Sequence, residues 1–120
     1  MARILLADDD KGSLELVRRA LEMDGHSVTV AEDGNEALAK LEPGGFDLLV
    51  ADVQMPGIDG IELAHKARGR FPDIHLVLMS GYADVLVKAR SLADNGARLM
   101  TKPFSIEQIR SEVRAALARR

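Results

Sequence analysis

Four short apolar runs in this chain each end at a side chain that can bind a metal ion or a phosphoryl group. Acids end the first two runs, a hydroxyl the third and an ammonium group the fourth: Asp8, Asp9 and Asp10 after Ile4 to Ala7, Asp52 after Leu48 to Ala51, Ser80 after Ile74 to Met79, and Lys102 after Ala97 to Thr101. A buried strand that ends in an acid delivers a charge to the rim of a sheet, where charges from neighbouring strands meet. Acids, a hydroxyl and an amine at four strand ends indicate a site for magnesium and a phosphoryl group.

The acids Asp8, Asp9 and Asp52 are expected to lie together. In a doubly wound parallel sheet, ligands bind beyond the carboxyl ends of the strands where the strand order reverses, and the first and third strands flank that point. Like charges about 4 Å apart repel by roughly 4 kcal/mol at a surface-like dielectric constant, so such a cluster needs a cation. Mg²⁺ fits best, because it takes one or two carboxylates together with waters and phosphate oxygens. Asp10 is predicted instead to cap the helix that follows.

An ionised Asp52 can attack phosphorus and form an aspartyl phosphate, a covalent intermediate of carboxylate nucleophiles. Phosphoryl transfer depends mainly on positioning and on charge stabilisation, so the phosphoryl oxygens need a metal ion, a hydroxyl and a cation nearby. Ser80 and Lys102 supply the last two. The residues alone therefore predict that Asp52 accepts a phosphoryl group with the help of Mg²⁺.

The elements that must position these residues alternate between short apolar runs and longer amphipathic runs. This rhythm predicts an α/β fold in which helices cover both faces of a parallel sheet. The predicted strands are Arg3 to Ala7, Ser27 to Ala31, Asp47 to Ala51, Ile74 to Met79 and Ala97 to Thr101. The predicted helices are one with Leu14, Val17 and Leu21 on its apolar face, then Gly34 to Leu41, Ile61 to Arg68 closed by Gly69, Ala83 to Asn95, and a last one whose apolar face comprises Ile106, Ile109, Val113 and Ala116 or Leu117. Ser105 and Gln108 form a capping box at the start of this last helix.

Length and composition exclude several classes of function. The 120 residues have room for one domain, residues 1–120, and we expect no attached output domain. A net charge of -3 gives no electrostatic basis for direct binding to nucleic acid. The chain has no cysteine, so a metal must use oxygen ligands or histidines. The apolar stretch at the start is too brief for a signal peptide or a membrane span, and we expect a cytoplasmic protein that does not enter a membrane.

The whole chain resembles the response-regulator receiver domains of bacterial two-component signalling, in particular the stand-alone CheY-like type. The matching motifs are Ile4-Leu5-Leu6-Ala7-Asp8-Asp9-Asp10, Asp52-Val53-Gln54-Met55-Pro56-Gly57 with Asp59-Gly60, Met79-Ser80-Gly81 and Lys102-Pro103-Phe104. The resemblance implies a flavodoxin-like (βα)5 sandwich with five parallel strands in the order 2-1-3-4-5. It also implies a phosphoacceptor switch, which is not an enzyme in the ordinary sense and at most slowly removes its own phosphoryl group.

The resemblance assigns roles to the acids of the site. Asp52 corresponds to the phosphoacceptor, and Asp8 and Asp9 to the pair that holds Mg²⁺ directly or through water. Gln54 is expected to offer its backbone carbonyl as a further ligand. The source of the phosphoryl group would be a phosphohistidine on a sensor histidine kinase or on a histidine phosphotransfer protein.

The resemblance also covers the switch, with one departure. Ser80 occupies the position of the family's conserved hydroxyl, and Lys102 that of the lysine that pairs with the phosphoryl group, with a cis peptide bond before Pro103. Receivers usually place a switch aromatic three residues before this lysine, but Leu99 stands there. We hypothesise that Tyr82, the only tyrosine, takes part instead.

The predicted output is protein binding, through a face made by the fourth helix, the fifth strand and the fifth helix. Within the family, Met1 to Ala7, Gly25-His26 and Asp59 to Ala64 resemble single-domain regulators that control substrate delivery to the Clp protease. Shuttling of a phosphoryl group between proteins of a phosphorelay is equally compatible with a lone receiver.

Two other functions are disfavoured, and the first of them uses the same architecture. A flavodoxin-like electron carrier would bind a flavin phosphate near residues 8 to 10, whose acids repel it. A phosphatase with an aspartyl nucleophile would need a second acid where Gln54 stands. Gly57 and Gly60 are predicted to be turn glycines rather than a phosphate cradle. The three histidines are predicted to be structural or exposed: His26, His65 and His75.

Overall fold

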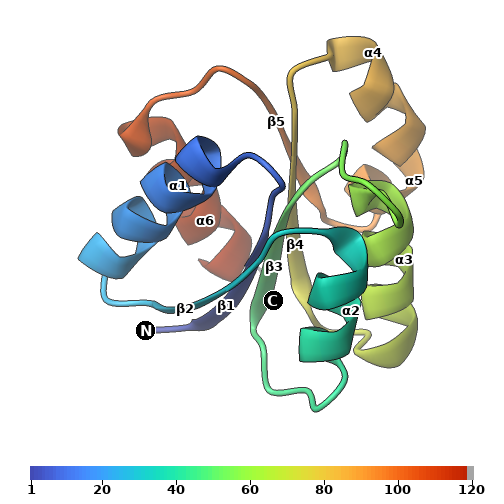
Figure 1. Cartoon of the computed structure of the whole chain (residues 1–120), viewed down its shortest axis with the longest axis horizontal. Helices are drawn as coiled ribbons and strands as arrows, with labels where there is room; N and C mark the ends of the chain where they lie inside the picture. The colour runs from blue at the N-terminus through green and yellow to red at the C-terminus, as the bar shows by residue number, and fades with distance from the viewer. Residues whose placement is uncertain (119–120) are drawn as a thin grey trace.

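The computed structural model describes residues 1–118, which form one five-stranded parallel sheet between two layers of helices (Figure 1). The strands are β1 (Arg3–Ala7), β2 (Ser27–Ala31), β3 (Leu48–Asp52), β4 (His75–Ser80) and β5 (Arg98–Thr101). Their order in the sheet is β2-β1-β3-β4-β5, and all neighbours are parallel. The predicted doubly wound α/β fold and its strand order are confirmed.

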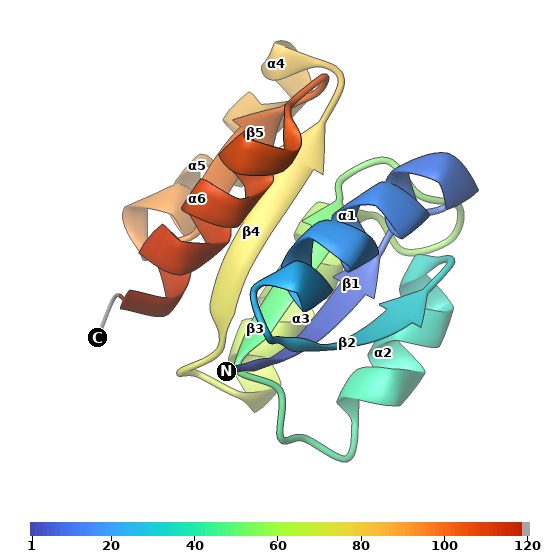
Figure 2. The same cartoon turned by 90° about the vertical axis from the view of Figure 1, so that its left-hand side faces the viewer.

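The helices divide between the two faces of the sheet (Figures 1 and 2). On one face lie α1 (Lys11–Met23) and α6 (Ile106–Ala118). The other face carries α2 (Gly34–Leu41), α3 (Gly60–Arg70), α4 (Ala83–Leu86), the 3₁₀ helix η1 (Val87–Ala89) and α5 (Arg90–Asp94). No helix within residues 1–118 has the length and apolarity needed to span a membrane.

Two apolar cores, one on each face, hold the layers together. Successive side chains of a strand point to opposite faces, so Leu5 joins the core under α2 and α3 while Ile4 joins the core under α1 and α6. In β3, Leu49 and Leu48 divide in the same way. Because both faces are covered, β1 and β3 are apolar along nearly their whole length. This is why the runs before Asp8 and Asp52 are continuous rather than alternating.

Most predicted boundaries agree with the structure within one or two residues. The strands Arg3 to Ala7 and Ser27 to Ala31 are as predicted, whereas β3 and β4 begin and end one residue later. As a result, Asp52 and Ser80 are the last residues of their strands. The third helix does not close at Gly69: it runs on to Arg70, and the N–H of Phe71 donates to Ala67 at its end.

The predicted helix from Ala83 to Asn95 is wrong as a single element, because η1 separates α4 from α5. Its buried side chains are Leu86, Ala89 and Leu92, three residues apart. A spacing of three is the repeat of a 3₁₀ helix, so tightening the chain at this point keeps all three against the core. Tyr82, before the first turn, provides no side-chain cap.

The last helix begins at the predicted capping box. The Ser105 N–H donates to Gln108 Oε1 at 2.7 Å, and the Gln108 N–H donates to Ser105 Oγ at 3.1 Å. Ile109, Val113 and Ala116 are buried, but Ile106 is 38% exposed, so the predicted apolar face begins one turn later. The box fixes where α6 starts, directly after the loop that carries Lys102.

Candidate functional site

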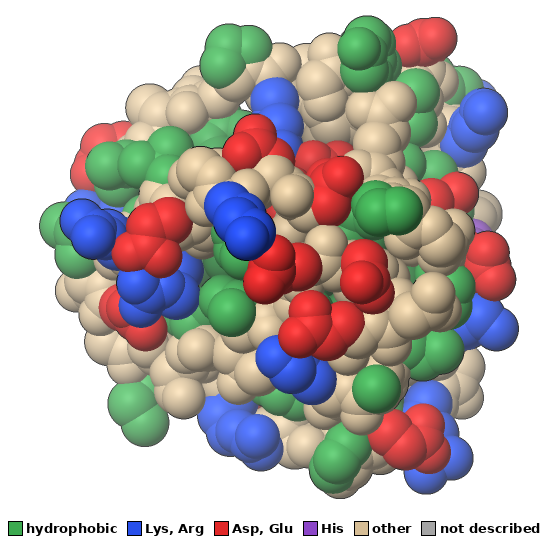
Figure 3. Space-filling model, viewed as in Figure 1, with side chains coloured by type: hydrophobic (Ala, Val, Ile, Leu, Met, Phe, Trp, Pro, Cys, Tyr) green, Lys and Arg blue, Asp and Glu red, His purple; other side chains and the backbone are tan. Residues whose placement is uncertain are grey.

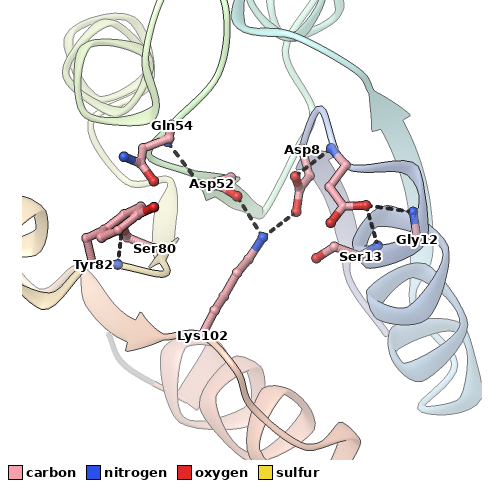
Figure 4. A network of polar contacts seen from close by, with 9 residues as sticks. Asp8, Gly12, Ser13, Asp52, Gln54, Ser80, Tyr82 and Lys102 are labelled. Carbon is pink, nitrogen blue, oxygen red and sulfur yellow. Dashed lines mark hydrogen bonds and ion pairs between the residues drawn. The ribbon is translucent and has the colours of Figure 1, made fainter.

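The predicted site residues come together at the carboxyl ends of the strands. Asp8 follows β1, Asp52 ends β3, Ser80 ends β4 and Lys102 follows β5 (Figure 4). On the face seen in Figure 3, acidic side chains gather over the loops that follow β1, β2 and β3. The parallel arrangement therefore brings together residues that lie far apart in the sequence.

The carboxylates of Asp8, Asp9 and Asp52 each offer an oxygen within 4.8 Å of the others. Asp8 and Asp52 are buried, and Asp9 is exposed. The loops fix the two buried carboxylates, because the Asp10 N–H donates to Asp8 Oδ1 at 3.0 Å and the Gln54 N–H donates to Asp52 Oδ1 at 2.9 Å. Three closely spaced carboxylate oxygens are a donor set suited to a hard divalent cation such as Mg²⁺.

Lys102 bridges the two buried acids. Its Nζ donates to Asp52 Oδ2 at 2.6 Å and to Asp8 Oδ2 at 3.0 Å (Figure 4). The sequence predicted that this lysine pairs with a phosphoryl group, and it did not predict the bond to both acids. The loop is held by the Lys102 N–H, which donates to the Ser80 carbonyl at 2.7 Å, and the peptide bond to Pro103 is cis as predicted.

Burial and the ion pairs set the charges of this cluster. Burial raises the pKa of the Asp52 carboxyl, and the hydrogen bond from Lys102 opposes that shift without cancelling it. Burial lowers the pKa of Lys102, but the hydrogen bonds to Asp52 and Asp8 outweigh burial, so the pKa of Lys102 is raised. Lys102 is therefore a charged ammonium group, and it acts as the counter-ion of the acids.

Asp10 has the separate role that its position predicted. Its Oδ1 accepts the N–H groups of Gly12 at 3.0 Å and Ser13 at 3.4 Å, and it is the N-cap residue of α1. The three successive acids thus divide between a helix cap and the acidic cluster.

Ser80 and Tyr82 meet at the start of α4. Ser80 is fully buried, and its Oγ accepts the Tyr82 N–H at 3.1 Å (Figure 4). The Tyr82 side chain is 59% exposed, whereas Leu99 is half-buried and packs against the core on the α3 side of the sheet. The part that Tyr82 plays in switching stays a prediction.

The two glycines after Asp52 differ, although both were predicted to be turn glycines. Gly57 is one, with a φ of 78°. Gly60 is instead the first residue of α3, and it is buried against the Asp52 backbone. Gly60 directly follows Asp59, which caps α3, at a helix position that tolerates many side chains. A glycine at such a position was the sequence signal for this close backbone contact.

The histidines lie outside the acidic cluster. His26 Nδ1 accepts the Ala2 N–H at 3.1 Å, and burial lowers the pKa of this imidazole. His65 is exposed and His75 is half-buried. The chemistry of the site therefore depends on carboxylates, a hydroxyl and an amine.

Comparison with known proteins gives one consistent family. Residues 4–114 match the family described as "Response regulator receiver domain". The chain is 37% identical over 117 residues to the response regulator receiver protein CpdR of Brucella abortus, and the alignment covers 98% of both chains. It is 36% identical over 117 residues to the response regulator MprA of Mycobacterium tuberculosis, covering 98% of this chain but only 51% of MprA. This chain thus spans about half the length of that relative.

Solved structures of other response regulators have the same fold. The response regulator TrrA of Thermotoga maritima, in complex with Mg²⁺ and BeF, superposes with a TM-score of 0.87 at 33% identity, covering 98% of this chain and 100% of TrrA. A CheY-like receiver domain protein from Methanospirillum hungatei superposes with a TM-score of 0.87 at 31% identity, covering 98% of this chain and 94% of the other.

Proposed function

Since this chain belongs to the response regulator receiver domain family, we propose that it is a phosphorylation-controlled switch whose phosphoacceptor is Asp52. The chain is a receiver domain of a two-component response regulator, and such domains are switches rather than enzymes. The observation that carries the proposal is the bridge from Lys102 to Asp52 and Asp8 inside the acidic cluster. It joins a nucleophilic carboxylate, metal ligands and a cation at one point.

The acidic cluster fits a divalent metal ion, and we propose that the ion is Mg²⁺. Asp8, Asp9 and Asp52 would hold it, with the backbone carbonyl of Gln54 as a further ligand. Their oxygens are the ligand type that Mg²⁺ prefers, and the few protein ligands leave room for waters and phosphoryl oxygens. A bound ion offsets the repulsion between the acids and an incoming phosphoryl group.

The residues of the chain then have separate tasks in the transfer. A carboxylate oxygen of Asp52 forms a bond to phosphorus while the bond from phosphorus to the donor's imidazole nitrogen breaks, and the imidazole leaves. Lys102 exchanges its bond to Asp52 Oδ2 for one to a phosphoryl oxygen. The Ser80 hydroxyl, which now accepts the Tyr82 N–H, turns to donate to a second phosphoryl oxygen. Loss of the phosphoryl group by hydrolysis is proposed to be slow.

The proposed partners act before and after this step. The donor would be a phosphohistidine on a sensor histidine kinase or a histidine phosphotransfer protein. The downstream target would bind the face formed by α4, η1, α5, β5 and α6. An open groove of about 490 Å³ between β5 and α6, lined in part by Leu99, Phe104 and Glu112, supports this choice of face. The downstream role stays a prediction with two alternatives: control of substrate delivery to the Clp protease, and shuttling of a phosphoryl group within a phosphorelay.

The proposal is tested by the intact mass of the protein after incubation with acetyl phosphate, with and without Mg²⁺. We expect a single phosphoryl adduct in the wild type with Mg²⁺, and none in Asp52→Asn. Asp10→Asn is the matched control, because it makes the same change two residues from Asp8 and asparagine still caps a helix. It should be labelled like the wild type.

Two outcomes would contradict the proposal. An adduct that persists in Asp52→Asn would mean that another residue accepts the phosphoryl group. An adduct that forms equally without Mg²⁺ would mean that the reaction does not need the metal ion. If the wild type took up no phosphoryl group under conditions in which a control receiver is labelled, a binding module that acts without phosphorylation would be favoured. Tight binding of flavin, or turnover of small phosphate esters, would favour the carrier or the phosphatase.

A further inference from the structure

Gly60 lies in direct contact with the backbone of Asp52, and the structure leaves no room for a side chain there. A Cβ at Gly60 would lie 2.8 Å from both the carbonyl carbon of Asp52 and the Cα of Val53, and it would overlap the Asp52 carbonyl oxygen. Contacts under 3.0 Å are essentially never made by real Cβ atoms, and all three atoms belong to the backbone. Either Asp52 or the start of α3 would have to move.

Hydrogen bonds fix the same point from both sides. The Val53 N–H donates to the Met79 carbonyl of β4 at 2.8 Å, and the Gly60 N–H donates to the Val53 carbonyl at 2.8 Å. Asp59 caps α3, since its Oδ1 accepts the Glu62 N–H at 2.8 Å. The first turn of α3 is therefore pressed against the peptide that follows the carboxylate. The reach of Asp52 toward Lys102 depends on where that peptide lies.

We propose that Gly60 is a positioning residue for phosphoryl transfer, which sets the place of the Asp52 carboxylate through contact between backbones. The inference rests on the proposed acceptance of a phosphoryl group by Asp52. Catalytic positioning is sensitive to small displacements: an error of about 1 Å can cost roughly 100-fold in rate. The glycine is required by space alone, because its φ is not positive.

Two other glycines of the chain provide matched controls for Gly60→Ala. Gly69 lies in the same helix, and a Cβ there meets nothing within 4 Å. Gly34 begins α2, and a Cβ there would lie 2.9 Å from the carbonyl carbon of Ile58 and overlap its oxygen. Gly34→Ala therefore creates a backbone clash of similar severity that does not touch Asp52.

The test measures the initial rate of adduct formation with acetyl phosphate at saturating Mg²⁺, together with stability in urea. We expect Gly60→Ala to form the adduct at least about tenfold more slowly than wild type while it is still folded. Gly34→Ala should lose stability but keep a rate within about twofold of wild type, and Gly69→Ala should keep both. A folded Gly60→Ala that reacts at the wild-type rate, or equal slowing by Gly34→Ala, would overturn the inference.

Two further readouts do not depend on phosphorylation. The amide of Gln54 bonds to Asp52 Oδ1, so its NMR resonance in metal-free protein should shift in Gly60→Ala and not in the controls. The affinity for Mg²⁺ should fall in Gly60→Ala only. If wild type accepted no phosphoryl group, the proposed function would fail, while these two measurements would still show whether Gly60 sets the place of the Asp52 carboxylate.

A measurement on the wild type covers the case in which Gly60→Ala does not fold. The Gly60 N–H donates to the Val53 carbonyl, and this hydrogen bond holds Gly60 against the Asp52 peptide. If that contact holds throughout the native state, the Gly60 amide should exchange its hydrogen only when the whole domain unfolds. Exchange of this amide by local opening, much faster than that of the β3 amides, would contradict the proposal.

Discussion

Replacing Lys102 with methionine removes the cation that lies between Asp8 and Asp52, and the site should then destabilise the fold. The ligand oxygens of the acids lie within 4.8 Å of each other, and two unit charges at that distance repel by about 3.5 kcal/mol at an effective dielectric constant of 20. Removing one partner of a buried ion pair costs roughly 3–5 kcal/mol. Because the Lys102 side chain is 22% exposed, we expect a lower loss, about 2–4 kcal/mol in the free energy of unfolding.

The assay is urea unfolding followed by far-ultraviolet circular dichroism, in metal-free buffer and again with saturating Mg²⁺. A bound cation takes over the neutralising charge, so Lys102→Met should recover most of its loss and gain more from Mg²⁺ than wild type does. Lys88→Met is the matched control, because Lys88 is exposed in η1 and should change stability by less than about 0.5 kcal/mol.

Two results would refute this reasoning. The first is a loss below about 1 kcal/mol without metal, which would mean that solvent already screens the acids. The second is an equal gain in stability from Mg²⁺ in wild type and variant, which would mean that Lys102 and the metal do not offset the same repulsion between carboxylates. Either result would separate the lysine from the electrostatics of the cluster.

Two further predictions concern other parts of the fold. The hydrogen bond from Arg110, at 3.0 Å from its Nε, lowers the pKa of Asp24, so this carboxyl stabilises the folded state above its unfolded pKa of about 3.9 and loses that contribution as the pH falls through the lowered value. The stability difference between wild type and Asp24→Asn should therefore be constant above about pH 5 and shrink below about pH 4 in thermal unfolding; a constant difference down to pH 2 would contradict it. Leu49→Ala, at a side chain with 0% exposure, should cost about 2–5 kcal/mol in urea unfolding, whereas Leu16→Ala, at 44% exposure, should cost less than about 0.5 kcal/mol. Equal losses would contradict the assignment of Leu49 to the core.

The strands and the acids of the site could be predicted because both depend on a pattern that the sequence states directly. A strand buried on both faces is a continuous apolar run, and its end is marked by the first charge, as at Asp8 and Asp52. In a parallel sheet all such ends lie at one edge, so the meeting of Asp8, Asp52 and Lys102 follows from topology.

The parts that could not be predicted depend on contacts between elements. Leu86, Ala89 and Leu92 fit a helical face in the sequence, and only packing against the sheet selects the 3₁₀ turn between α4 and α5. Gly60 differs from the turn glycine Gly57 in the sequence because it directly follows the capping Asp59, but its contact with the Asp52 peptide depends on where α3 lies. The two hydrogen bonds that Lys102 makes, to Asp8 and to Asp52, likewise depend on how loops distant in the sequence lie relative to each other.

The bridge made by Lys102 has a consequence for the order in which the protein assembles. This lysine lies 94 residues after Asp8 and 50 residues after Asp52, and it belongs to the last loop before the final helix. Contacts so distant in sequence form late, since loop closure must precede them. A nascent or incompletely folded chain therefore carries paired, repelling acids without their cation. The edge that we propose as the site of phosphoryl acceptance is completed only when β5 has docked, so a complete site indicates that the sheet has fully formed.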